Sequence, residues 1–101
     1  IIEIKLEIIK SENEVILKGN LTASNVFQIK RYCMALLEQN NALKINLSGL
    51  YQLDVSAAIM LRDLKVAASS DDKFLIVTNG QNEKIAGAFS RLDYQVLQVI
   101  A

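Results

Sequence analysis

Hydrophobic positions recur along the chain with two periods, one typical of strands and one typical of helices. At the N-terminal end Ile2, Ile4, Leu6 and Ile8 alternate with charged residues, which predicts a strand with one apolar face. Further along, apolar residues recur every three or four positions, as in an amphipathic helix. The changes of period predict elements in the order β-β-α-β-α-β-α-β, namely strands 2–8 and 15–18, helix 21–40, strand 43–47, helix 54–70, strand 74–77, helix 81–92 and strand 96–100.

Polar segments mark where these elements begin and end. Residues 11–14 form a short polar connection, which predicts a hairpin between the first two strands. Thr22 and Ser24 are candidate N-caps of the first helix, and Asn40-Asn41 is a candidate stop. The third strand is expected to end at Ser48-Gly49.

The order of elements predicts the fold class. Strand-helix-strand units call for parallel crossovers with helices packed on a sheet, and the leading hairpin adds an antiparallel strand. We therefore expect an α/β fold with a mixed sheet and helices packed against it. A chain of 101 residues is normally one domain, so residues 1–101 are expected to form one domain.

The apolar residues of the helices divide into an inner stripe and a remainder. The stripe of the second helix consists of Ala57, Leu61, Leu64 and Ala68. Cys33 falls on the inner face of the first helix and is expected to be inert core. Four further apolar residues of these two helices cannot all be placed on the inner stripes, namely Phe27, Met34, Ile59 and Met60. They either extend a broad apolar face or form a partner-docking patch with the loop before the second helix.

Composition excludes several kinds of function. The 11 Lys+Arg balance the 11 Asp+Glu, and without a basic run we expect no nucleic-acid binding. The chain has no His, so the commonest general base is missing, and with one Cys there is no zinc site of the usual kind. The glycines are scattered, so there is no phosphate-binding glycine loop. We therefore expect no catalytic residues, no metal and no cofactor.

The cellular location is also constrained. One Cys cannot form an intramolecular disulfide, which fits a reducing, cytoplasmic compartment. The apolar runs are too short to span a bilayer, and the first residues do not resemble a signal peptide, so no membrane insertion is expected. Because there is no initiator Met, the sequence is expected to be trimmed or part of a longer chain.

The segment before and within the start of the second helix is the best candidate site. It carries Asp54 and Ser56 where a helix begins, and a helix N-terminus offers unpaired N–H groups and partial positive charge. A Ser hydroxyl is expected to be accessible there, and a phosphate on it would be tolerated by the dipole. The commoner role of such residues is capping of the helix. Tyr51, just before them, is either an anchor of the loop or part of a docking surface.

Several segments in the same order resemble the STAS domain, the fold of bacterial anti-sigma factor antagonists and of the cytoplasmic tails of sulfate transporters. The resemblance covers nearly the whole chain. It is carried by Gly19-Asn20-Leu21-Thr22, Ile45-Asn46-Leu47-Ser48-Gly49-Leu50, Asp54-Val55-Ser56-Ala57-Ala58, Phe74-Leu75-Ile76-Val77 and Phe89-Ser90-Arg91-Leu92-Asp93-Tyr94. It implies a STAS fold and a non-enzymatic domain that regulates transcription by binding proteins.

The resemblance also implies a phosphorylation switch. In the antagonists a Ser or Thr is phosphorylated by the partner kinase, which is the anti-sigma factor, and a phosphatase reverses the reaction. The matching residue here is Ser56, and Asp54 matches the Asp beside it. The expected partner-binding residues are Tyr51, Asp54, Val55, Ser56, Ala57, Ile59 and Met60. A homo-oligomer is also compatible with the resemblance.

The chain departs from the family pattern at the candidate switch. Val55 stands where the family has a Ser, Ala57 where it has a Gly, and Asp93 where it has a second Gly. These departures keep an alternative open, in which the domain is a constitutive STAS subunit or tail. In that role it would dock the ATPase of an ABC lipid-transport machine or an anion transporter without switching.

Overall fold

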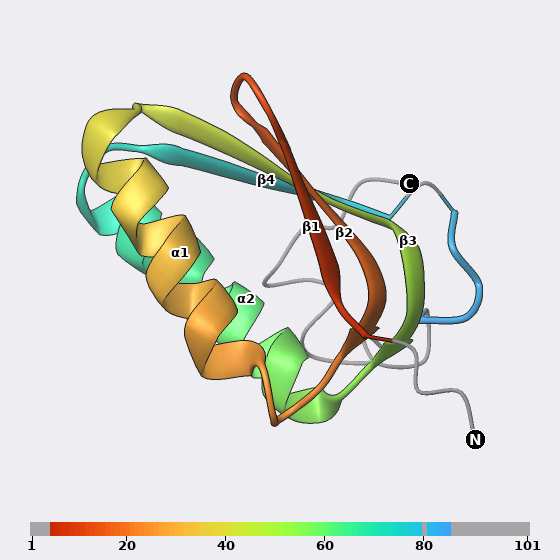
Figure 1. Cartoon of the computed structure of the whole chain (residues 1–101). Helices are drawn as coiled ribbons and strands as arrows, with labels where there is room; N and C mark the ends of the chain where they lie inside the picture. Colours follow the sequence, from red (N-terminus) through yellow and green to blue (C-terminus); the bar gives the residue numbers. More distant parts are fainter. Residues whose placement is uncertain (1–4, 80, 86–101) are drawn as a thin grey trace.

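The computed structural model describes residues 5–79 and 81–85, which contain four strands and two helices. In chain order these elements are β1 (Glu7–Ser11), β2 (Glu14–Leu21), α1 (Val26–Gln39), β3 (Ala42–Leu53), α2 (Val55–Ser70) and β4 (Phe74–Thr78). Figure 1 shows the two helices lying side by side beneath the strands. Over this part of the chain, the predicted order of strands and helices is confirmed.

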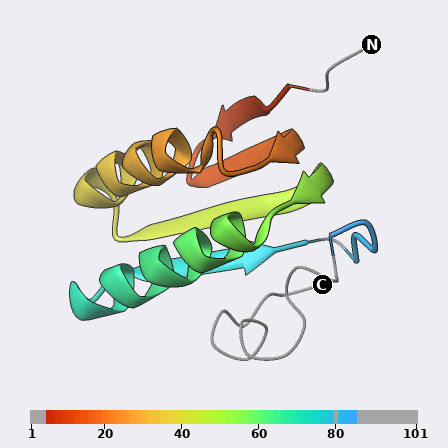
Figure 2. The same ribbon diagram turned by 90° about the horizontal axis from the view of Figure 1, so that it is seen from below.

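The strands form one mixed sheet in the order β1-β2-β3-β4. β1 and β2 are antiparallel, as a short hairpin connection dictates, with Ile8 opposite Leu17. β2 and β3, and β3 and β4, are parallel, because a helix carries the chain back between the members of each pair. Both helices cover the same face of the sheet (Figure 2). The expected α/β fold with a mixed sheet is therefore confirmed.

The core lies between the two helices and the face of the sheet that they cover. Alternate residues of the strands point into it, as Leu43, Ile45 and Leu47 of β3 show with at most 2% exposure. The predicted inner stripe of α2 is buried at every position, namely Ala57, Leu61, Leu64 and Ala68. Cys33 of α1 is buried as expected, and loss of hydration raises the pKa of its thiol from 9.0 to about 12.

The first helix begins later than its apolar pattern suggested. α1 starts at Val26 and its N-cap is Asn25, so the prediction that Thr22 or Ser24 caps it is wrong. The carbonyl of Thr22 instead accepts the N–H groups of Asn25 and Val26, which forms a turn before the helix. The Asn25 side chain points back into this turn, where its Oδ1 accepts the Thr22 N–H at 2.9 Å.

The third strand continues beyond its predicted end at Ser48-Gly49 and stops at Leu53. The pairing of β2 with β3 shifts twice, between Ile16 and Lys18 and between Gly19 and Asn20. At each shift β3 holds one more residue than β2, which is the pattern of a β-bulge. Gly19 has a φ of 100°, a conformation that favours glycine. Bulges let the strand bend and continue where hydropathy alone indicated a loop.

The ends of the described chain also differ from the predicted elements. The first strand runs from Glu7 to Ser11, and residues 1–4 of the prediction lie outside the described residues. The helix predicted from Gln81 does not begin there, because Gln81 has a φ of 62° and residues 81–85 form turns. The rest of that helix and the predicted strand 96–100 lie outside the described residues.

Truncation of Leu61 tests how much the helix-sheet core contributes to stability. Leu61 is fully buried, so Leu61→Ala should lower the free energy of unfolding by about 2–5 kcal/mol through lost burial and a residual cavity. Val66 lies on the same helix but is 56% exposed, so Val66→Ala should change it by less than about 0.5 kcal/mol. Urea unfolding followed by circular dichroism measures both variants, and equal effects would contradict the assigned core face.

The thiol of Cys33 provides a second test of the core. Because its pKa is raised to about 12, almost no thiolate forms in the folded chain at pH 8. A thiol reagent should therefore label the folded protein slowly and the urea-unfolded protein quickly. Labelling of the folded chain at the rate of an exposed cysteine would show that the face of α1 that carries Cys33 is not packed on the sheet.

Candidate functional site

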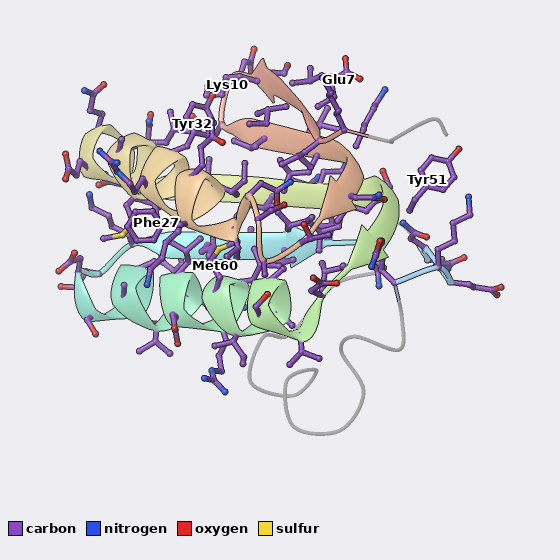
Figure 3. The ribbon with its side chains drawn as sticks, turned by 60° about the horizontal axis from the view of Figure 1, so that its bottom comes forward. Glu7, Lys10, Phe27, Tyr32, Tyr51 and Met60 are labelled. Carbon is purple, nitrogen blue, oxygen red and sulfur yellow. The ribbon has the colours of Figure 1, made fainter. Side chains whose placement is uncertain are left out.

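The bulged end of β3 turns the side chain of Tyr51 away from the core. Leu50 pairs with Gly19 and Gln52 with Asn20, so Tyr51 between them has no partner residue in β2. The ring is 54% exposed and projects from the bend of the sheet, far from Phe27 on α1 (Figure 3). The Lys84 ammonium lies 4.1 Å from the ring centroid, a cation–π arrangement. Tyr51 thus lies on the surface, where its ring contacts Lys84 of the turn after β4.

Asp54 connects the start of α2 to the connection between β2 and α1. It is the N-cap residue of α2 by position, but its side chain makes no capping hydrogen bond. Its Oδ2 accepts the backbone N–H of Ala23 at 3.2 Å, and its Oδ1 accepts the Gln52 Nε2 at 3.3 Å. Its own N–H donates to the Leu21 carbonyl at 3.0 Å. The carboxylate therefore ties together two segments that are 31 residues apart.

Ser56 lies in the first turn of α2, and its hydroxyl has no structural partner. The residue is partly exposed, but its Oγ is buried and makes no hydrogen bond to the described residues. The hydroxyl was expected to be accessible, and in this rotamer it is not. Capping was the commoner role expected for Asp54 or Ser56, and neither side chain caps the helix. A buried hydroxyl without a partner costs about 1–3 kcal/mol, so Ser56 is a poor choice for stability alone.

The other predicted docking residues divide between the surface and the core. Val55 is 65% exposed and Ile59 is 38% exposed, so both are available to a partner on the outer side of α2. Ala57 and Met60 are buried, because they lie on the side of the helix that faces the core. They support the site from beneath but cannot contact a docking protein. Phe27, on α1, is exposed at a distance from Tyr51 (Figure 3).

The first turn of α2 also presents backbone donors. The Asp54 carbonyl accepts the N–H groups of Ala57 and Ala58, at 3.0 and 3.1 Å. The N–H groups of Val55 and Ser56 precede these bonds, so they have no helical carbonyl in reach. Together with the helix dipole they favour negative charge at this end of α2. The arrangement can therefore stabilise an added anionic group next to Ser56.

Neither a metal-binding cluster nor a membrane-spanning helix is found among the described residues. Within residues 5–79 and 81–85, no cluster of His, Cys, Asp or Glu is suited to holding a metal ion. None of the helices in these ranges is both long enough and apolar enough to cross a membrane. The candidate site at the end of β3 presents exposed side chains, Tyr51 and Val55 among them, and the backbone donors at the start of α2.

Sequence reasoning missed four residues that shape this surface. Ala23, Asn82 and Lys84 act through contacts that join distant parts of the chain, and Gln52 contacts Asp54, two residues further along. Hydrophobic period and local motifs report only nearby residues, so they carry no signal for the distant contacts. Asn79-Gly80 predicted a break after β4, but the sequence did not indicate that the turn carrying Asn82 lies against β3.

Comparison with known proteins places the fold. No family model matches the sequence, and no curated protein matches it. Among solved structures, the anti-sigma factor antagonist SpoIIAA in its unphosphorylated form aligns with a TM-score of 0.68 over 92% of this chain and 82% of its own. The chain shares its fold with SpoIIAA. Because the two sequences are only 15% identical, the likeness concerns the fold alone. It confirms the STAS-type fold expected from the motifs.

Removal of the Asp54 carboxylate tests the link between α2 and the connection before α1. Asp54→Ala should lower the free energy of unfolding by roughly 1–3 kcal/mol, because it removes a charge-assisted hydrogen bond and a favourable helix-dipole contact. The Ala23 amide should also exchange faster with solvent in nuclear magnetic resonance spectra. Asp63→Ala, an exposed control on the same helix, should change neither quantity. Unchanged exchange at Ala23 in Asp54→Ala would contradict the link.

Proposed function

We propose that this chain is a non-enzymatic, cytoplasmic regulator that binds a protein partner through the end of β3 and the start of α2. The partner is an anti-sigma factor with serine kinase activity, and phosphorylation of Ser56 releases it. The proposed docking surface consists of Tyr51, Asp54, Val55, Ser56 and Ile59. The fold shared with an anti-sigma factor antagonist supports this class of partner.

The observation that carries the proposal is the state of the Ser56 hydroxyl. It neither caps α2 nor bonds to a described residue, so its presence has no structural explanation. Two nearby residues in the sequence are exposed, since Val55 is 65% and Tyr51 54% exposed, and aromatic residues such as Tyr51 are common at interfaces. A change of the Ser56 side-chain rotamer is enough to bring a hydroxyl at this position toward solvent.

The physical effect of a phosphate at Ser56 differs between the free chain and the complex. The group adds about −1.5 to −2 charges at neutral pH. In the free chain, water and the N-terminal end of α2 accommodate this charge. In a complex, the partner would have to remove water from the phosphate and from Asp54 nearby, which costs several kcal/mol unless the partner supplies matching cations. Phosphorylation is therefore expected to dissociate the complex without unfolding the domain.

The buried position of Ser56 Oγ also favours a second candidate function. While its side chain keeps this rotamer, a hydroxyl that is covered in the folded chain is a poor kinase substrate. In that case the same surface would dock a partner constitutively, as a subunit beside an ABC lipid-transport ATPase or an anion transporter. The two candidates share the docking surface and differ in whether Ser56 is modified.

Incubation with candidate kinases separates the two. The purified chain is mixed with ATP and each anti-sigma factor-type serine kinase of the same genome, and phosphate is mapped by mass spectrometry. We expect modification at Ser56, and Ser56→Asp should weaken binding of that kinase roughly tenfold or more, because each tenfold corresponds to about 1.4 kcal/mol. Ser56→Ala should keep binding and abolish the modification.

Ser69 provides the matched control. It is an exposed serine at the other end of α2, so Ser69→Ala should leave both phosphorylation and binding unchanged. Phosphate on a residue other than Ser56, or equal binding by Ser56→Asp and the unaltered chain, would refute the switch. Binding that persists without any phosphorylation would support the constitutive candidate.

A further inference from the structure

Among the strands that the structure describes, none pairs with the carbonyls at the bulges of β3 on the side of β4. β4 pairs with β3 only as far as Thr78, which lies opposite Asn46. β3 continues to Leu53, so its last residues pass beyond the end of β4. Backbone carbonyls at the edge of a sheet need other donors, and an unpaired one is costly where water is excluded.

The side chain of Asn82 supplies the missing donor. Its Nδ2 lies 2.8 Å from the Leu50 carbonyl, 3.1 Å from that of Leu47 and 3.2 Å from that of Ser48. One amide nitrogen carries two hydrogens, so the three carbonyls share them. These residues come just before the point where Tyr51 leaves the β2 register. A single side chain thus takes the place of β4 along the bulged part of β3.

The turn that carries Asn82 is itself held firmly. The Asn82 N–H donates to the Asn79 carbonyl at 3.0 Å, and the Asn82 Oδ1 accepts the Lys84 N–H at 3.1 Å. Asn79 and Ile85 on either side are buried, with 3% and 1% exposure. Lys84 in turn lies over the Tyr51 ring. Asn82 therefore connects a turn anchored in the core to the exposed residue at the bulge.

We propose that Asn82 is a positioning residue for the docking surface, acting through the conformation of β3 that presents Tyr51 to a partner. This inference rests on the proposed function for the identity of the partner. The geometry from Asn82 to Tyr51 does not depend on it. Without the amide, the carbonyls of Leu47, Ser48 and Leu50 form hydrogen bonds with water instead. The bulge is then free to change its register or its angle.

Two variants of Asn82 test the positioning step directly. Asn82→Ala removes the donor, and Asn82→Asp keeps the shape but replaces the donor by an acceptor. Both should shift the amide resonances of residues 47–53 and the ring resonances of Tyr51. Asn40 provides the matched control, because its Nδ2 donates to one carbonyl, that of Leu36, at the end of α1. The corresponding Asn40 variants should leave those resonances unchanged, and unshifted resonances in the Asn82 variants would overturn the inference.

A double-mutant cycle tests whether the effect reaches the partner through Tyr51. Against the kinase identified above, Asn82→Ala should weaken binding about tenfold in the unaltered chain and hardly at all in a Tyr51→Ala background. Equal weakening in both backgrounds would overturn the route through Tyr51. Asn82→Asp, which also removes the donor, serves for the same cycle if truncation unfolds the chain, and Asn40→Ala should weaken binding in neither background.

The two proposals fail in different ways. If none of the kinases binds the unaltered chain, the proposed function fails, while the resonances of residues 47–53 still decide whether Asn82 positions the bulge. If a kinase binds and Asn82→Ala shifts those resonances without weakening binding, the proposed function stands and the role of Asn82 in docking is refuted.

Discussion

The candidate site depends on the way β3 is paired along its length. In its first half β3 lies between two parallel neighbours, and its alternate residues are buried under the helices. In its second half it pairs, among the described strands, with β2 alone, and it holds two more residues than β2 does. The excess length bends the strand and leaves Tyr51 without a partner residue in β2. The unpaired position of Tyr51 is a consequence of this mismatch between paired strands.

The parts of the fold that were predictable from the sequence are those that depend on burial. α2 was predicted almost to the residue, because one continuous apolar stripe runs along it and polar residues follow its end. The end of β3 was missed because Ser48 and Gly49 are typical of turns, and a bulge leaves no trace in hydropathy. The pairing that keeps these residues in the strand is made with β2, a segment far away in the sequence.

The candidate site was predictable in position but not in detail. The spacing of Asp54 and Ser56 at a helix start indicated the correct end of α2. It could not indicate that Asp54 bonds to Ala23 instead of capping, since that bond spans 31 residues. It also suggested an exposed Ser56 hydroxyl, whereas the Oγ is buried. Side-chain direction at a helix terminus depends on neighbours that a local pattern does not contain.

On the proposed function, the fixed position of Asp54 explains why a phosphate at Ser56 would act on a complex more than on the free domain. Hydrogen bonds from Ala23 and Gln52 hold the carboxylate in place, so it cannot swing away from a second negative charge. In water, screening and the dipole of α2 keep that repulsion small. Under a docked partner this screening is lost, and the repulsion between the two negative charges raises the free energy of the complex. The same bonds that order the docking surface therefore make it sensitive to phosphorylation.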